Sequence, residues 1–184
     1  TILDNAFAGD VAITALTIPS TVTQLDSFAF SGCDGLTTMT IPYGITTLSA
    51  SIFSMCDNLV SVNLPSTITS IANGAFYFCT GLQSITIPSA VTTLGSSSFY
   101  GCYGLTSITF ESGTLLTSIG TTAFGECGNL PAIIIPLGVT YVGYKAFDLC
   151  HALTIDCEAS EMPLDWNPDW NFSNCPVTWG YVPE

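Results

Sequence analysis

The 184-residue chain carries a single basic side chain, Lys145, against fourteen acidic ones, and its formal net charge is −13. This balance excludes nucleic acid and anionic membrane surfaces as partners, because both are bound through clustered lysine and arginine. We also expect no membrane insertion. No apolar run approaches the ~20 residues of a membrane-spanning helix, and the longest candidate, AIIIPLGV, contains a proline.

A repeat of 23 residues runs along the chain. The stretch FSGCDGLTTMTIP at residues 30–42 returns as FSMCDNLVSVNLP and FYFCTGLQSITIP, with a phenylalanine at the start and a cysteine three residues later. Only the first copy differs, with Asp10 in place of the cysteine. Self-similarity at this period is typical of stacked coils. The phenylalanines are spaced by 23 residues, with one step of 25, at Phe7, Phe30, Phe53, Phe76, Phe99, Phe124 and Phe147.

Each copy predicts two short strands. LTTMTIP (36–42) and LQSITIP (82–88) alternate apolar and small polar residues, which indicates a half-buried strand that ends at the proline. ITTL (45–48), ITSI (68–71) and VTTL (91–94) predict a second extended segment. One unit cannot bury its apolar face alone, so we expect a repeat solenoid of about seven coils with short parallel strands and no long helix.

The repeat changes at two places. At residues 111–115, ESGTL adds two residues to a turn, where we expect the coil to bulge outward and leave the core columns intact. After Leu153 the apolar columns fail, with Asp156 and Glu158 at positions expected to be buried. We therefore predict a solenoid over residues 1–155 and a capping segment over 156–184. The cap is rich in aromatic side chains, namely Trp166, Trp170, Phe172, Trp179 and Tyr181.

The consensus Leu-x-x-Ile-x-Ile-Pro-x-x-Val-Thr-x-Ile-x-x-x-x-Phe-x-x-Cys resembles the BspA-like leucine-rich repeat of bacterial and protist surface proteins. The resemblance extends from Thr1 to about Ile155, and the tail is similar to the closing segment that often follows such arrays. It implies a leucine-rich-repeat fold, a surface or secreted location, and a role in adhesion or protein binding. The repeat carries no catalytic motif, so we expect no enzymatic activity.

Six cysteines form one column of the repeat. They recur singly, not in close pairs with histidine, which argues against a metal site and favours buried free thiols that fill volume. Disulfides between neighbouring coils are the alternative, since a strand spacing of ~4.8 Å lies within the range of Cα distances that a disulfide spans. Cys157 and Cys175 flank the cap and suggest a loop-closing disulfide, with two free thiols as the alternative. The column is Cys33, Cys56, Cys79, Cys102, Cys127 and Cys150.

Two surfaces are candidates for binding. Aromatic side chains gather around the Phe-to-Cys turns outside the core columns, and such side chains are typical anchors for a protein or glycan partner. These are Phe28, Tyr77, Phe78, Tyr100 and Tyr103. A threonine column forms a polar face that suits exposed strands and also resembles an ice-binding ladder. Its members are Thr23, Thr46, Thr69, Thr92, Thr117 and Thr140.

The cap adds two further candidates. In DWNPDWN the side chains of Asp165, Asn167 and Asp169 alternate as in a calcium loop, although Asx residues also favour turns without a metal. The sequence predicts no cofactor, with calcium as the one alternative. Asn171 begins the glycosylation sequon NFS.

Our hypothesis is a non-enzymatic extracellular or cell-surface domain for adhesion or binding of a protein or glycan on a cell surface or matrix. The main alternative is self-association end to end into an extracellular fibre or coat, since the first coil begins part-way through its repeat and exposes apolar columns. Ice binding through the threonine column is a lesser alternative.

Overall fold

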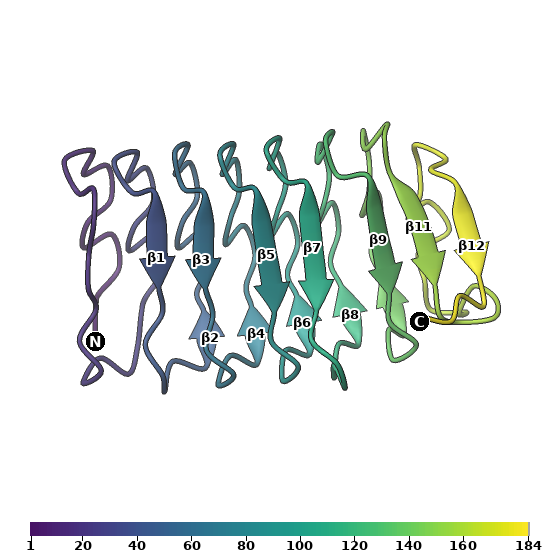
Figure 1. The fold of residues 1–184 in the computed structure, drawn as a ribbon, viewed down its shortest axis with the longest axis horizontal. Coiled ribbons are helices and arrows are strands. Elements are labelled where there is room, and N and C mark those ends of the chain that lie inside the picture. The colour runs from purple at the N-terminus through teal and green to yellow at the C-terminus, as the bar shows by residue number, and fades with distance from the viewer. Residues whose placement is uncertain (184) are drawn as a thin grey trace.

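Short parallel strands form two rows along the long axis of the molecule, one row toward the viewer in Figure 1 and the other lower and behind it. The structure, a computed structural model, describes residues 1–183. Neighbouring strands are one repeat apart, so that Thr38 lies opposite Ser61 and Ser61 lies opposite Ser84. This arrangement confirms the predicted repeat solenoid.

The strands fall into three sheets. The front row contains β1 (Thr38–Thr40), β3 (Ser61–Asn63), β5 (Ser84–Ile87) and β7 (Ser107–Phe110), and then a separate sheet of β9 (Ala132–Ile135), β11 (Thr154–Cys157) and β12 (Val177–Trp179). The second row contains β2 (Thr47–Leu48), β4 (Ser70–Ile71), β6 (Thr93–Leu94), β8 (Ser118–Ile119) and β10 (Tyr141–Val142). The first coil contributes a single bridge between Ile2 and Leu25. Across residues 1–183 there is no helix long and apolar enough to cross a membrane.

The repeat phenylalanines stack on one another through the core. Successive ring centroids lie 5.1–5.6 Å apart, and the ring planes differ by 2–17°. Offset stacking of this kind is favoured by the charge distribution of aromatic rings. The rings from Phe30 to Phe147 are fully buried, whereas Phe7 in the first coil is half-buried. The column therefore joins all coils into one continuous core.

The turn around each repeat phenylalanine contains two residues with left-handed backbone. The first lies two positions before the phenylalanine and the second lies two positions after it. This geometry points N–H groups at the next coil: Phe28 donates to the carbonyl oxygen of Ala50 at 3.0 Å, and Gly32 donates to that of Ser54 at 2.8 Å. A non-glycine residue in this conformation costs about 1–2 kcal/mol, which the bonds between coils must offset. The second position is occupied by Gly9, Gly32, Met55, Phe78, Gly101, Glu126 and Leu149.

The front row is interrupted between β7 and β9. In earlier coils the N–H groups of Val60, Gln83 and Thr106 each donate to a carbonyl oxygen one coil before, at 2.8–3.0 Å. The next residue of this column is Pro131, which has no N–H, so this bond cannot form and β9 does not pair with β7. Pairing resumes when Thr154 donates to Pro131 at 2.9 Å.

The interruption lies beside the two-residue insertion. The second row continues past it, because β6 still pairs with β8. In the front row, however, Ile108 and Phe110 of β7 are only half-buried, while Ile85 and Ile87 of β5 are buried. The core columns thus stay continuous past the insertion, as expected, although Ile108 and Phe110 pack against the core while half-buried.

The strand ladder continues into the tail. Within β11, Ile155 lies opposite Ile133 and Cys157 lies opposite Ile135, so the boundary predicted after residue 155 falls inside this strand. Asp156 and Glu158 are half-buried at the surface rather than in the core, since the apolar columns continue one residue earlier than expected. β12 then pairs with β11.

Aromatic side chains of the tail cover the last coil. Trp166 and Trp170 are buried, and Trp170 packs edge to face on the Phe147 ring with 5.8 Å between centroids. The tail thus ends the phenylalanine stack with an indole. This packing agrees with a capping role for the tail.

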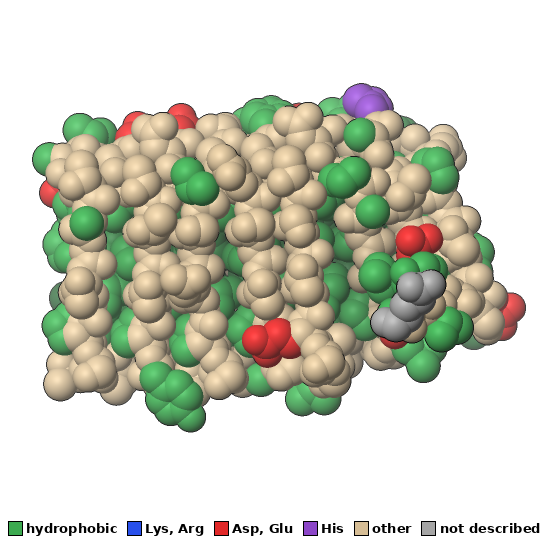
Figure 2. Space-filling model, in the orientation of Figure 1, with side chains coloured by type: hydrophobic (Ala, Val, Ile, Leu, Met, Phe, Trp, Pro, Cys, Tyr) green, Lys and Arg blue, Asp and Glu red, His purple; other side chains and the backbone are tan. Residues whose placement is uncertain are grey.

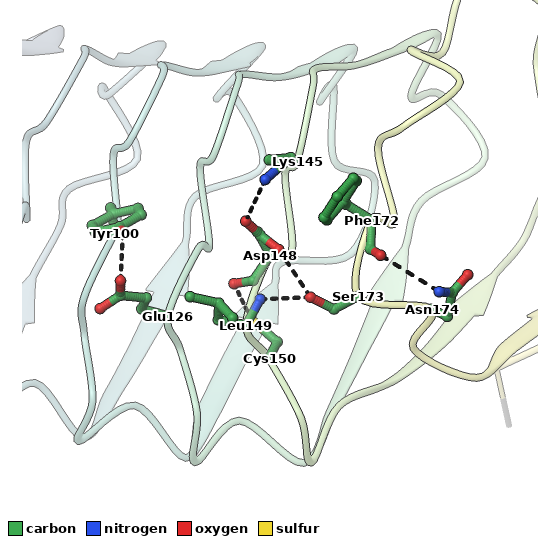
Figure 3. A network of polar contacts seen from close by, with 9 residues as sticks. All are labelled: Tyr100, Glu126, Lys145, Asp148, Leu149, Cys150, Phe172, Ser173 and Asn174. Carbon is green, nitrogen blue, oxygen red and sulfur yellow. Dashed lines mark hydrogen bonds and ion pairs between the residues drawn. The ribbon is translucent and has the colours of Figure 1, made fainter.

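The single lysine fastens the tail to the last coil (Figure 3). Its Nζ lies 3.2 Å from Asp148 Oδ2 and 3.9 Å from the centre of the Phe172 ring. Ser173 Oγ donates to Asp148 at 3.0 Å and accepts the N–H of Leu149 at 2.7 Å. A cation over an aromatic face and a carboxylate paired with the same cation reinforce each other.

The cysteine column provides hydrogen-bond donors. Each of the six column thiols donates to the carbonyl oxygen of the phenylalanine one coil earlier, with Sγ–O distances of 2.9–3.2 Å. All eight cysteines are buried and free. Burial raises the pKa of the Cys56 and Cys150 thiols to about 12 and that of Cys79 well above its ordinary value. The column therefore fills volume and also satisfies a buried carbonyl in each coil.

The predicted disulfide between Cys157 and Cys175 is not formed in the structure. Cys175 lies beside Cys150, the last member of the cysteine column, with its Sγ 3.4 Å from the carbonyl oxygen of Cys150. Cys157 belongs to a different column, opposite Ile135 in the front row. The two thiols are separated because the tail is wound as a further coil rather than as a loop closed on itself.

Truncation of one stacked ring should destabilise the whole array. We expect Phe76→Ala to lower the free energy of unfolding by about 4 kcal/mol, because it removes a fully buried ring and leaves a cavity. Chemical denaturation monitored by circular dichroism measures this. Tyr43→Ala, which changes a 74% exposed ring outside the stack, serves as the control, and an equal loss in both variants would contradict the proposed importance of the stack.

Alkaline pH should unfold the protein. Between the ordinary thiol pKa of 9.0 and about 12, buried thiols such as Cys56 stay protonated in the folded state but ionise in the unfolded state. The unfolded state then binds fewer protons, so the free energy of unfolding falls as pH rises, by about 1.4 kcal/mol per pH unit for each thiol. Urea midpoints measured from neutral pH to about pH 11 test this.

Two controls accompany the alkaline experiment. Cys79→Ala should make the fall with pH shallower, since one buried thiol no longer titrates. Thiol labelling of the denatured protein should count all eight cysteines as free. Urea midpoints that stay level above pH 9.0 would contradict the thiol account, and a count short by two would restore the disulfide.

Candidate functional site

Four aromatic side chains come together on the turns of two neighbouring coils, and we call them the aromatic patch. Tyr77 and Phe78 lie on one coil, edge to face, with ring centroids 4.7 Å apart. On the next coil, Tyr100 stacks on Tyr77 at 5.5 Å and Tyr103 meets the edge of Phe78 at 5.9 Å. Phe28, also predicted for this surface, is 43% exposed but lies two coils away, and no described ring stacks on it. The structure thus brings four of the five predicted residues together.

Glycines of the following coil make room for the rings. A Cβ atom at Gly101 would lie 3.0 Å from the Phe78 ring, and one at Gly125 would lie 2.7 Å from the Tyr100 ring. Phe78 itself has left-handed backbone, with φ of 54°. The patch therefore depends on an aromatic residue on one coil and a glycine at or next to the same turn position of the next coil.

Glu126 holds the two tyrosines of the second coil. The phenol of Tyr100 donates to Glu126 Oε1 at 2.5 Å (Figure 3), and the phenol of Tyr103 donates to Oε2 of the same carboxylate. These hydrogen bonds to the carboxylate raise the pKa of both tyrosines, so both stay neutral donors. Glu126 was not among the residues predicted from the sequence for this surface. Its place two residues after Phe124, equivalent to Phe78 in its own coil, is the signal that locates it on this surface.

A groove opens beside the patch on its N-terminal side. It has a volume of about 550 Å³. The exposed Met55 side chain and the Phe78 and Tyr77 rings give it apolar walls, and Asp34 and Asp57 supply carboxylates. The complete lining is Gly32, Asp34, Met55, Asp57, Tyr77, Phe78 and Thr80.

A second cleft, of about 650 Å³, lies where β7 and β9 fail to pair. Ile108, Phe110 and the exposed Leu137 give it a largely apolar lining. The carboxylates of Glu111 and Glu158 at this cleft already accept backbone N–H groups, from Ser89 at 2.9 Å and from Leu137 at 2.8 Å respectively. Figure 2 shows hydrophobic atoms between the strand ridges of this face, among mostly uncharged polar side chains.

The threonine column is used within the solenoid. The hydroxyl of Thr69 donates to the carbonyl oxygen of Thr46 at 3.1 Å, and Thr92 donates to Thr69 at 3.2 Å. Thr117 and Thr140 repeat the contact at 3.1 and 3.4 Å. Because each of these four hydroxyl protons already has an internal acceptor, the geometry accounts for Thr69, Thr92, Thr117 and Thr140 without a ligand.

The candidate calcium and glycosylation residues of the tail form hydrogen bonds within local turns. Asn167 Oδ1 accepts the N–H of Asp169 at 2.9 Å. Asn171 uses both ends of its amide on Cys175, donating to its carbonyl oxygen at 2.8 Å and accepting its N–H at 2.9 Å. Within residues 1–183 no three His, Cys, Asp or Glu side chains gather as a metal site would require. Calcium binding near Asp165 and glycosylation of Asn171 stay predictions.

No nucleophile for catalysis is assembled in the cysteine column. Cys150 is buried and its pKa is raised to about 12, so its thiolate is disfavoured. The neighbouring His151 is exposed in the turn.

Comparison with known proteins identifies the repeat. The family description "BspA type leucine rich repeat region" matches residues 1–115 and 113–178, with six copies. The chain belongs to the BspA-type leucine-rich-repeat family. The matched range of this BspA-type domain extends to residue 178, in agreement with the continuation of the ladder through β11 and into β12. A comparison with curated proteins finds no match.

Solved structures share the fold of this BspA-type domain. A leucine-rich cell surface protein from Faecalibacterium prausnitzii is 23% identical, with a TM-score of 0.53, over 97% of this chain and 69% of that one. The leucine-rich-repeat protein of T. pallidum is 20% identical, with a TM-score of 0.69, over 88% of this chain and 81% of that one. The pneumococcal vaccine antigen PcpA is 25% identical, with a TM-score of 0.58, over 67% of this chain and 31% of that one.

Removal of the Glu126 charge should make the two tyrosines easier to ionise. We expect Glu126→Gln to lower the pKa of Tyr100 and Tyr103 toward the ordinary value of 10.0, because the carboxylate no longer stabilises the neutral phenols. Ultraviolet absorbance of tyrosinate measures the change, over the part of an alkaline titration in which circular dichroism shows that the domain is still folded. Glu161→Gln in the tail is the matched control. Tyrosine titration that is identical in both variants would contradict the assignment.

Proposed function

We propose that this BspA-type domain is a non-enzymatic, extracellular or cell-surface binding domain that holds a protein or glycan partner through the aromatic patch. The observation that carries the proposal is the patch itself: Tyr77, Phe78, Tyr100 and Tyr103 form one surface outside the core. Leucine-rich-repeat domains generally mediate protein binding, and this is the surface of the chain best suited to it.

The chemistry of the patch favours binding at small entropic cost. Tyrosine and phenylalanine bury much apolar area with only two side-chain torsions each, and they are enriched among residues that dominate binding energy. Here the torsions are restricted in advance, since Tyr100 stacks on Tyr77 and its phenol is held by Glu126. A surface ordered before binding loses less entropy when the partner arrives.

The location is proposed from the family. BspA-type repeats are typical of cell-surface proteins, and the similar chain from Faecalibacterium prausnitzii is described as a cell surface protein. The proposal is non-enzymatic because the cysteine thiols are buried and their pKa values are raised, which makes them poor nucleophiles. End-to-end assembly and ice binding stay predictions that no contact described above favours.

Binding to glycan and protein arrays tests the proposal. For a ligand that the domain captures, we expect Phe78→Ala and Tyr103→Ala each to weaken binding by about tenfold or more, as for central aromatic anchors. Biolayer interferometry on the purified domain measures the change in affinity.

Tyr43→Ala is the matched control, because Tyr43 is 74% exposed and lies outside the patch. Its binding should equal that of the unchanged domain. A captured ligand whose affinity is unaffected by the patch variants, or equally reduced by Tyr43→Ala, would overturn the patch as the binding surface.

A further inference from the structure

The groove beside the aromatic patch contains two carboxylates that lack cations. Asp34 Oδ1 accepts the N–H of Asp57 at 3.5 Å, and Asp57 Oδ1 accepts the hydroxyl of Thr80 at 3.3 Å. The second oxygen of each carboxylate accepts no hydrogen bond from the described chain. The one ion pair of residues 1–183 joins Lys145 to Asp148, two coils beyond the patch.

The remaining walls of the groove are apolar and polarisable. Met55 is 54% exposed at the left-handed position of its turn, and Phe78 occupies the same position one coil later. The same molecule shows how it accommodates a cation beside an aromatic ring, since the Lys145 ammonium lies 3.9 Å from the centre of the Phe172 ring while paired with Asp148. The groove offers the same two elements, an aromatic ring and a carboxylate, without an internal cation.

We propose that this groove binds an arginine side chain from a segment of a partner protein, with Asp34 and Asp57 pairing with the guanidinium and Met55, Tyr77 and Phe78 packing against it. The inference rests on the proposed function and specifies the partner of the same surface. Arginine fits better than lysine, because a planar guanidinium makes bidentate bonds to carboxylates and stacks on aromatic rings. The net charge of −13 adds long-range attraction for a basic segment.

Two short peptides test the proposal, one rich in arginine and one with citrulline at each of the same positions. Citrulline keeps the planar shape and removes the charge. Isothermal titration at physiological salt should give measurable affinity for the arginine peptide only. The double variant Asp34→Asn, Asp57→Asn should weaken that affinity at least about tenfold, as expected when charge-assisted hydrogen bonds are lost.

The control is the double variant Asp165→Asn, Asp169→Asn, which makes the same change in net charge but in the tail. It should alter the affinity for the arginine peptide less than about twofold, because distant charges are screened by salt. Equal weakening by both double variants would show diffuse charge attraction and overturn the proposal. Equal binding of the citrulline peptide, or no binding of either peptide, would also overturn it. In each of these cases an array ligand lost on Phe78→Ala would leave the proposed function standing, so the two failures are distinguishable.

Discussion

The structure depends on the backbone hydrogen bonds that connect each coil to the next in parallel register. They force every residue to lie beside its counterpart one repeat away, so phenylalanine meets phenylalanine at 5.1–5.6 Å and each cysteine reaches the carbonyl oxygen of a phenylalanine one coil earlier. The same bonds impose left-handed backbone at two positions of each turn, even where the residue is Met55 or Phe78. Local strain and core packing are thus consequences of one constraint that repeats along the chain.

The surface features arise where the sequence departs from its repeat without breaking that constraint. Aromatic residues at two successive turns give the aromatic patch, and Phe78 and Tyr100 each face a glycine of the following coil. A single proline at a donor position interrupts the front row and opens a cleft, while the second row continues beside it. In both cases the surface is changed in one or two coils, and the ladder elsewhere keeps it rigid.

The fold could be predicted from the sequence because stacking converts a period of 23 residues directly into neighbours in space. The strand positions, the stacked phenylalanines and the buried cysteine column follow from that period alone. The prediction failed where the pattern was read one residue out of register: Asp156 and Glu158 were expected in the core, although Ile155 and Cys157 carry the columns onward. The tail then continues the winding of the coils, and Cys175 lies beside Cys150 instead of closing a loop with Cys157.

The candidate site could be predicted only in part. The aromatic residues were visible as outliers from the core columns, but Phe28 shares their chemistry and not their location, because it lies on the other side of its turn. The turn position of Glu126 places it on the same surface, but its role comes from hydrogen bonds to two tyrosines on the preceding coil, which that position alone does not indicate. The interruption at Pro131 could not be predicted, because the sequence does not show which N–H groups form hydrogen bonds between coils.

We propose that partners bind at the turns where the repeat is altered and not on the regular threonine face or at the ends. Hydrogen–deuterium exchange of the domain with and without a captured ligand tests it most directly. We expect new protection at the turns of residues 55–57, 77–80 and 100–103, with the strands unchanged. Protection concentrated on the threonine column or at either end of the solenoid would contradict it.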